Sequence, residues 1–161
     1  MKCIVAVDKN WGIGKKNDLL FYLPYDLKEH FKPHTLNKVV VMGANTFYSL
    51  PKGALPKRIN VVLDHTGTQH VGATTVTTLD ELFEHIKQYN TDDVMIIGGA
   101  TVYKLMLPYC DTAYITKVDA DGEAEVFFPN LDENGEWYLA ETLQSGEENG
   151  ISYKMLLYKR K

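Results

Sequence analysis

The chain has little cysteine, no long apolar run and no excess of basic charge. Its two cysteines, Cys3 and Cys110, lack metal-ligand spacing, so we expect reduced thiols in a cytoplasmic protein. The first residues, MKCIVAVDKN, have only five consecutive apolar residues before charge, which fits neither a signal peptide nor a membrane span. The net charge is −4 and the only basic run is YKRK at 158–161, so we expect neither nucleic acid nor an anionic membrane as partner.

What is present is an ordinary globular composition. The chain has 161 residues, of which 45% are hydrophobic and 24% charged. This length suits one domain with a real core, and no repeat or linker interrupts it. We therefore expect a single domain over residues 1–161.

Strand-like and helical patterns alternate along most of the chain. β-Branched runs occur at 3–8, 38–43, 59–64, 74–78 and 93–99, and later at 112–118, 137–143 and 152–159. Helical patterns occupy 24 to about 32, 44–50, 79–89 and 100–107. Continuously apolar runs such as KVVVM predict a mostly parallel mixed sheet covered on both faces, hence an α/β fold. The last two runs flank SGEENG at 145–150, which predicts an antiparallel hairpin at one edge.

The stretch after the first strand, VDKNWGIGKKNDLL, predicts an active-site loop. Ligands of open α/β sheets bind beyond the carboxyl ends of the strands. A dinucleotide fingerprint would need a third glycine where Asn17 stands, so that interpretation fails. Gly12 and Gly14 would give backbone freedom to a lid, with Trp11 and Ile13 as apolar cover, and the alternative is a plain surface loop.

Two later strand ends carry glycine before a helix. In VVVMGANTF, Gly43 and Thr46 suit either a phosphate cradle or a tight connection. In MIIGGATVY, the adjacent Gly98 and Gly99 indicate that a ligand passes close to the backbone or that the peptide is strained.

Asp26 follows an apolar stretch and begins a helical pattern in FYLPYDLKEHF. A carboxylate so placed is either a solvated first-turn residue or an acid aimed into a pocket. The residue pattern alone leaves both interpretations open.

Taken together, five stretches resemble dihydrofolate reductase. They are IVAVDKNWGIGKKNDLLFYLPYDL, TLNKVVVMGANTF, LPKRINVVL, MIIGGATVY and YITKVDADGEAEVFFP, and they occur in the family's order over nearly the whole chain. The resemblance implies an eight-stranded mixed sheet with about four helices. It also implies the family's activity in one-carbon metabolism, which is the reduction of dihydrofolate by NADPH without a metal. From the same resemblance we expect a cytoplasmic monomer that is a target of antifolates.

The resemblance assigns site residues position by position. Asp26 would be the pterin-binding acid, a bidentate acceptor whose pKa burial raises, and Thr116 its support. Leu27 and Phe31 would be pocket walls, and Arg58 would bind the α-carboxylate of the glutamate tail. The catalytic set is Asp26, Thr116, Leu19 and Phe21. The substrate set is Val5, Ala6, Asp26, Leu27, Phe31, Ser49, Leu55, Arg58, Ile97 and Thr116. The cofactor set is Ala6, Ile13, Gly14, Gly43, Ala44, Asn45, Thr46, Leu63, Asp64, His65, Ile97, Gly98, Gly99, Ala100, Thr101, Val102 and Tyr103. Gly98–Gly99 would be the family's cis peptide.

Three departures from the family pattern affect these assignments. Leu20 and Phe21 stand where proline and tryptophan are usual. Asp26 and Phe31 are five positions apart where four is usual, so either a local bulge brings Phe31 to the pocket or His30 takes its place. Glu125 replaces the usual aspartate in AEVFFP.

The ribose-phosphate positions predict weak discrimination between NADPH and NADH. Ala44 and Asn45, then Asp64 and His65, stand where the family commonly has arginine and hydroxyl side chains. Asp64 would repel a 2′-phosphate if it pointed inward. Alternatively, Asp64 points to solvent and His65 or a lysine supplies the charge.

Two other functions compete with dihydrofolate reduction. The reductase domain of riboflavin synthesis has the same fold and cofactor, but Asp26 and Arg58 argue against it. A nucleotide-binding module without catalysis has no need of a buried acid at the far end of the cleft.

Overall fold

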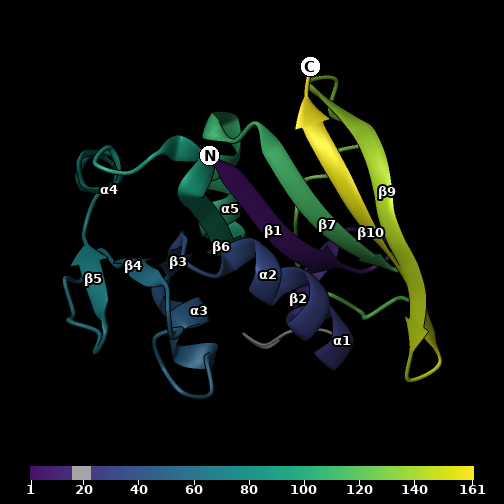
Figure 1. The fold of residues 1–161 in the computed structure, drawn as a ribbon, viewed down its shortest axis with the longest axis horizontal. Coiled ribbons are helices and arrows are strands. Elements are labelled where there is room, and N and C mark those ends of the chain that lie inside the picture. Colours follow the sequence, from purple (N-terminus) through teal and green to yellow (C-terminus); the bar gives the residue numbers. More distant parts are fainter. Residues whose placement is uncertain (16–22) are drawn as a thin grey trace.

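The structure is a computed structural model that describes residues 1–15 and 23–161. Its described residues form an eight-stranded sheet in the order β5-β4-β3-β6-β1-β7-β10-β9 (Figure 1). The strands are β1 (Lys2–Val7), β3 (Val39–Gly43), β4 (Ile59–Leu63), β5 (Ala73–Val76), β6 (Val94–Gly98), β7 (Thr112–Val118), β9 (Trp137–Glu148) and β10 (Ile151–Arg160). The six strands from β5 to β7 are parallel, whereas β10 is antiparallel to β7 and to β9. The predicted α/β fold with an antiparallel C-terminal hairpin is confirmed.

Four helical segments among the described residues cover the sheet. They are α1 (Pro24–Asp26), which continues through a π-helical turn (Leu27–Phe31) into α2 (Lys32–Thr35), then α3 (Ala44–Ser49), α4 (Leu79–Ile86) and α5 (Ala100–Met106). The residues at the start of α4 explain why a helix begins there. The Thr78 hydroxyl accepts from Glu81 N at 3.1 Å, and the Glu81 carboxylate accepts from Thr77 N at 2.8 Å. A threonine cap with glutamate three positions on is a helix-start signal.

Alternate side chains of a strand point to opposite faces of the sheet. Different helices pack on these two faces. Leu82 of α4 and Met106 of α5 pack on the face that holds Val41 and Ile96. Phe47 of α3 packs on the other face, together with the partly buried Phe31. That second face is the one on which Asp26 lies, as its contact with β7 shows below.

The C-terminal hairpin is longer than predicted. The chain reverses at Asn149 and Gly150, whose φ values of 54° and 78° suit a two-residue hairpin turn. β9 therefore runs on through the polar residues 145–148, which we had predicted to be turn. Gly146 explains the pairing in this stretch, since a Cβ there would lie 2.8 Å from the Tyr153 hydroxyl, so the aromatic ring covers the glycine.

The first helix also extends beyond its predicted end near Lys32, although Pro33 follows. In the π-helical turn the amide of Lys32 bonds to the carbonyl of Leu27, five positions back. A proline ring clashes with the carbonyl four positions back in a regular helix, and a π-turn changes that geometry. The helix thus continues to Thr35.

A second, two-stranded sheet was not predicted. β2 (Gly12–Gly14) pairs with β8 (Val126–Phe127). Strands this short leave no periodicity in the sequence.

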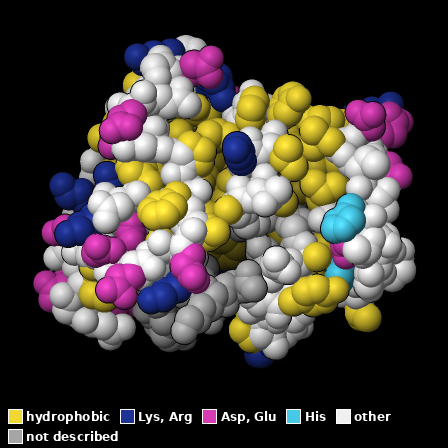
Figure 2. Space-filling view, turned by 180° about the vertical axis from the view of Figure 1, so that it is seen from behind, with side chains coloured by type: hydrophobic (Ala, Val, Ile, Leu, Met, Phe, Trp, Pro, Cys, Tyr) yellow, Lys and Arg dark blue, Asp and Glu magenta, His cyan; other side chains and the backbone are white. Residues whose placement is uncertain are grey.

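Within the described residues no helix combines the length and hydropathy needed to span a bilayer. On the face turned away in Figure 1, hydrophobic side chains gather around a hollow (Figure 2).

Candidate active site

Asp26 is buried at the start of the first helix. It is 7% exposed, and the hydroxyl of Thr116 on β7 donates to its Oδ1 at 2.5 Å. Burial raises the pKa of the Asp26 carboxyl, the hydrogen bond from Thr116 opposes that rise, and the charge of Glu148 adds to it. Of the two interpretations of Asp26, the structure supports the acid in a pocket.

The π-helical turn accommodates the extra residue between Asp26 and Phe31. Phe31 packs with Leu50 and Leu55 against the core of the sheet face that carries Asp26. His30 is buried as well, between His34 at 4.8 Å and Tyr114 at 5.9 Å between ring centroids. The bulge therefore brings Phe31 to the pocket face, and His30 is buried beside it, not in its place.

Arg58 is connected to the end of this helix. Its Nε donates to Thr35 Oγ1 at 2.9 Å, and its Nη1 donates to the carbonyl of Pro56 at 3.0 Å. Partial burial lowers the pKa of the guanidinium. The buried Asn60 shapes the loop before Arg58, because its side-chain amide bonds both the amide and the carbonyl of Leu55, each at 2.9 Å. The guanidinium is thus oriented by two separate elements.

The inner strands bring some predicted residues together and separate others. Ala6 pairs with Thr116, and Ile97 belongs to the same cluster as Phe31 and Leu55, so these residues share one face. The side chain of Val5 packs on the opposite face, against the cluster of α4 and α5, because adjacent strand residues alternate. Of the remaining predicted pocket residues, Leu27 and Ser49 are exposed.

The glycine-rich strand ends meet. The Gly98–Gly99 peptide is cis, as the resemblance implied. A Cβ on Gly98 would lie 3.4 Å from Thr46 Oγ1 and 3.3 Å from the ring of Tyr103, and one on Gly99 would lie 3.3 Å from the same oxygen. On Gly43 it would lie 3.2 Å from Val102. Side chains larger than hydrogen would therefore close the space between α3 and α5.

Asp64 at the end of β4 faces neither solvent nor an open groove. Its Oδ1 accepts from the amide and hydroxyl of Thr66 at 3.0 and 2.8 Å, and its Oδ2 lies 3.0 Å from His70 Nε2. The Thr66 hydroxyl and then His70 lower the pKa of Asp64. His70 packs on Phe47 of α3, with 5.0 Å between ring centroids. Both interpretations of Asp64, inward or solvent-facing, are replaced by an internal pair with His70.

The other predicted cofactor residues surround this edge. Ala44 and Leu63 are half-buried, and Asn45 and His65 are exposed. At the start of α5, Ala100 is half-buried and Thr101 exposed, whereas Val102 and Tyr103 are buried. The Tyr103 hydroxyl donates to the Ile4 carbonyl at 2.7 Å, which joins α5 to β1.

The loop after β1 is tied to the segment before β8. The carboxylate of Asp8 accepts from Asn10 N and Gly12 N, each at 2.8 Å, and from Gly122 N at 3.1 Å. Glu125 N donates to the Gly14 carbonyl at 2.8 Å. Ile13 is half-buried, but Trp11 lies in the main core and not over the site. The predicted residues Leu19 and Phe21, like residues 16–20 of the predicted lid, lie outside the described residues.

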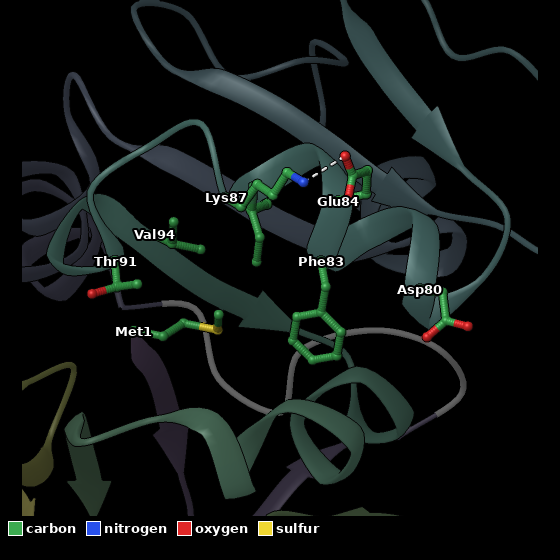
Figure 3. Close-up of a pocket in the computed structure, with 8 residues that line it drawn as sticks. Met1, Asp80, Phe83, Glu84, Lys87, Thr91 and Val94 are labelled. Atoms are coloured by element: carbon green, nitrogen blue, oxygen red, sulfur yellow. Dashed lines mark ion pairs between the residues drawn. The ribbon is translucent and has the colours of Figure 1, made fainter.

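A cavity of about 560 Å³ lies elsewhere (Figure 3). It is lined by Met1, Phe83 and Val94, with the Glu84–Lys87 ion pair at 2.7 Å beside it. Met1 and Val94 stand at the amino ends of β1 and β6. The candidate site lies at the carboxyl ends of the strands, so this cavity is at the opposite edge of the sheet.

Within the described ranges, His, Cys, Asp and Glu side chains form no group of three or more that could bind a metal.

Sequence reasoning missed several residues that shape the site. Ile4 lies on the pocket face and accepts the Tyr103 bond, and strand alternation would have favoured it over Val5. His70 and Glu148 were missed because nothing local marks them. Glu148 contacts Tyr25, which is 123 positions away.

The fold and the site together define an α/β enzyme with a buried acid, Asp26, on one sheet face and glycines before the helices that follow β3 and β6. Residues 1–160 match the family described as dihydrofolate reductase. The chain is 35% identical to a dihydrofolate reductase of Bacillus subtilis over 98% of its length and 93% of that protein's, and 33% identical to one of Haemophilus influenzae over 98% and 97%. It also resembles the structure of "Dihydrofolate reductase from Enterococcus faecalis complexed with NADP(H)and RAB-propyl", with a TM-score of 0.86 and 29% identity, over 99% of this chain and 95% of that one. The chain belongs to the dihydrofolate reductase family.

Proposed function

We propose that this protein reduces 7,8-dihydrofolate to 5,6,7,8-tetrahydrofolate by direct hydride transfer, with Asp26 as the acid of the pterin pocket. In the reaction the C6=N5 double bond becomes single, as carbon 6 takes a hydride and nitrogen 5 a proton. The observation that carries this proposal is the buried carboxyl of Asp26, bonded to Thr116 on the pocket face.

Asp26 has two tasks in this reaction. Its carboxylate can accept two parallel donors from the amino-pteridine edge, which orients the ring. Because burial raises the pKa of Asp26, the group holds a proton at higher pH than an exposed aspartate would, and this favours protonation of nitrogen 5. Thr116 supports the carboxyl in both tasks by donating to Oδ1.

Apolar walls and one cation complete the substrate pocket. Phe31, Leu55 and Ile97 exclude water around the reacting ring. Arg58 suits the α-carboxylate of the glutamate tail, since its bonds to Thr35 and Pro56 orient the guanidinium in advance.

The glycine-rich strand ends fit the cofactor, NADPH, which supplies the hydride when bound. Gly43, Gly98 and Gly99 leave the backbone open where a Cβ would fill the space beside Thr46 and Val102. Neither α3 nor α5 has a side-chain cap, so their first amides suit the pyrophosphate. We further propose weak selection of NADPH over NADH, because Ala44 offers the 2′-phosphate no charge.

The two competing functions make different predictions for Asp26. A nucleotide-binding module would bind NADPH but not oxidise it in the presence of dihydrofolate. A riboflavin-type reductase would act on a different substrate and would not depend on Arg58. Loss of NADPH absorbance on addition of dihydrofolate separates dihydrofolate reduction from both alternatives.

The test of the mechanism is Asp26→Asn. This change keeps the shape and an acceptor for Thr116 but removes the acid, so single-turnover hydride transfer at neutral pH should fall by roughly two orders of magnitude or more. The matched control is Asp92→Asn, an exposed aspartate away from the pocket. Turnover of Asp26→Asn within about threefold of the parent would sink the assignment.

We also propose a cytoplasmic monomer. Cys3 and Cys110 are free, buried thiols, which suits a reducing compartment. Every described group assigned above comes from a single chain, so the site needs no second copy.

A further inference from the structure

Glu148, at the end of β9, contacts the helix turn that carries Asp26. Its Oε2 and Oε1 both accept from the backbone amide of Tyr25, at 3.0 and 3.2 Å. A second bond from the same strand runs from Gln144 Nε2 to the Tyr25 hydroxyl at 2.8 Å. The hairpin of β9 and β10 is thereby attached to the residue next to Asp26.

The start of this helix lacks a cap of its own. Leu27 N bonds to the Leu23 carbonyl at 3.1 Å, so Leu23 precedes the first turn, and its side chain has no acceptor. Pro24 follows and has no amide hydrogen. Tyr25 N is then a first-turn donor, and Glu148 supplies the acceptor that the local sequence does not. An anionic acceptor at this end also interacts favourably with the helix dipole.

The charge of Glu148 acts on the surroundings of Asp26. Within the part of the chain that the structure describes, Thr116 on β7 contacts Asp26, and Glu148 on β9 and Tyr153 on β10 interact with it electrostatically, with Tyr25 next to it in the helix. Burial and then the charges of Glu148, Tyr25 and Asp26 raise the pKa of Tyr153, so the hydroxyl stays neutral. Of the groups named here, Glu148 is the only one that brings a second negative charge at neutral pH.

We propose that Glu148 is a positioning residue for the reduction: it caps the turn that presents Asp26 and brings a second negative charge to the surroundings of that carboxyl. That charge adds to the effect of burial in raising the pKa of Asp26. This inference rests on the proposed role of Asp26. A neutral amide would cap Tyr25 N equally well, so Glu148→Gln separates the charge from the hydrogen bond. Glu148→Asp keeps the charge on a shorter side chain.

The experiment follows single-turnover hydride transfer from NADPH to dihydrofolate across about pH 5 to 9. In Glu148→Gln the midpoint of the pH profile should move to lower pH by about half a unit, as expected for loss of one like charge near a carboxyl. The rate on the acid plateau should stay within about twofold, while above the midpoint it should fall by about threefold. Glu148→Asp should keep the parent midpoint.

Glu147→Gln is the matched control, since Glu147 is the exposed neighbour on the same strand. Its profile should overlay that of the parent. About 1 M salt should move the parent midpoint toward that of Glu148→Gln and leave Glu148→Gln nearly unchanged, a test that needs no folded variant beyond the parent.

The outcomes separate this inference from the proposed function. A folded Glu148→Gln whose midpoint matches the parent, or a parent midpoint that salt does not move, overturns the role of Glu148. A pH profile that survives Asp26→Asn overturns the role of Asp26 instead.

Discussion

Replacing His30 by leucine is expected to remove a large part of the acid sensitivity of this protein. His30 is 2% exposed within the π-helical turn, and its Nε2 is buried without a hydrogen-bond partner among the described residues. Burial, followed by the nearby charge of His34, lowers its pKa from the usual 6.5 to about 4. The imidazole is therefore held neutral in the folded protein.

The size of the effect follows from the two pKa values. As the pH falls below 6.5, the unfolded chain takes up a proton at this position before the folded protein does, so the stabilisation is present above 6.5 and is lost toward 4. Between about pH 7 and pH 5 the loss from His30 alone is about 2 kcal/mol, or roughly a thirtyfold change in the ratio of folded to unfolded protein.

Urea unfolding of the parent and of His30→Leu at several pH values measures this loss. The difference between the two free energies of unfolding should change by about 2 kcal/mol over that interval in favour of the variant. His65→Leu is the control, because His65 is exposed, and its difference from the parent should stay flat. If His30→Leu loses as much stability on acidification as the parent, His30 is protonated in the folded state and the reasoning is wrong.

Three further predictions concern the site. The pKa of Asp26 is raised on folding, so its ionised form opposes folding at neutral pH. Asp26→Asn should therefore raise the Tm at neutral pH, and this gain in Tm should shrink below about pH 4. An equal gain in Tm at all pH values would contradict this. Arg58→Leu should weaken methotrexate binding by about tenfold or more and leave trimethoprim, which lacks the glutamate tail, nearly unaffected; equal losses in titrations of both would assign Arg58 to the fold. The preference for NADPH over NADH in kcat/KM should be at least about tenfold smaller than in a relative with the arginine, and Ala44→Arg should restore part of it. Asp64→Asn should change that preference little, because the carboxylate is already hydrogen-bonded to Thr66 and His70. If the protein is strongly selective for NADPH and neither substitution changes that selectivity, the 2′-phosphate is bound elsewhere.

The sheet was predictable because its inner strands are continuously apolar. Runs such as KVVVM are typical of parallel strands that are buried on both faces, and β7 has the predicted bounds of 112–118. The residues at 145–148 are polar and include a glycine, so they resemble a turn, and only their pairing with Tyr153 and its neighbours makes them strand. Propensity is a weak guide where a partner strand determines the structure.

The site was predictable where a residue's role depends on its neighbours in the sequence. Asp26, Gly43 and the glycine pair stand at strand or helix boundaries that the sequence marks. Val5 was predicted as a pocket residue together with its neighbour Ala6, although adjacent strand residues point to opposite faces, and its side chain packs on the face away from the pocket. The partners of Asp26 and Asp64, Glu148 and His70, come from other elements, and no local pattern connects them.

The central position of β1 has a consequence for synthesis of the chain. Lys2 pairs with Met95 on one side and with Thr112 on the other, so both neighbours of β1 are made about a hundred residues later. Until then the apolar strand that will lie in the middle of the sheet has no partner, while β3, β4 and β5 can already pair. Parallel pairings at such separation form slowly, and an unpaired apolar strand is open to contacts with other chains. On the ribosome, β1 is therefore made before both of its partner strands, and pulse proteolysis of stalled nascent chains should find the 3–8 segment cleavable until residues 112–118 have emerged.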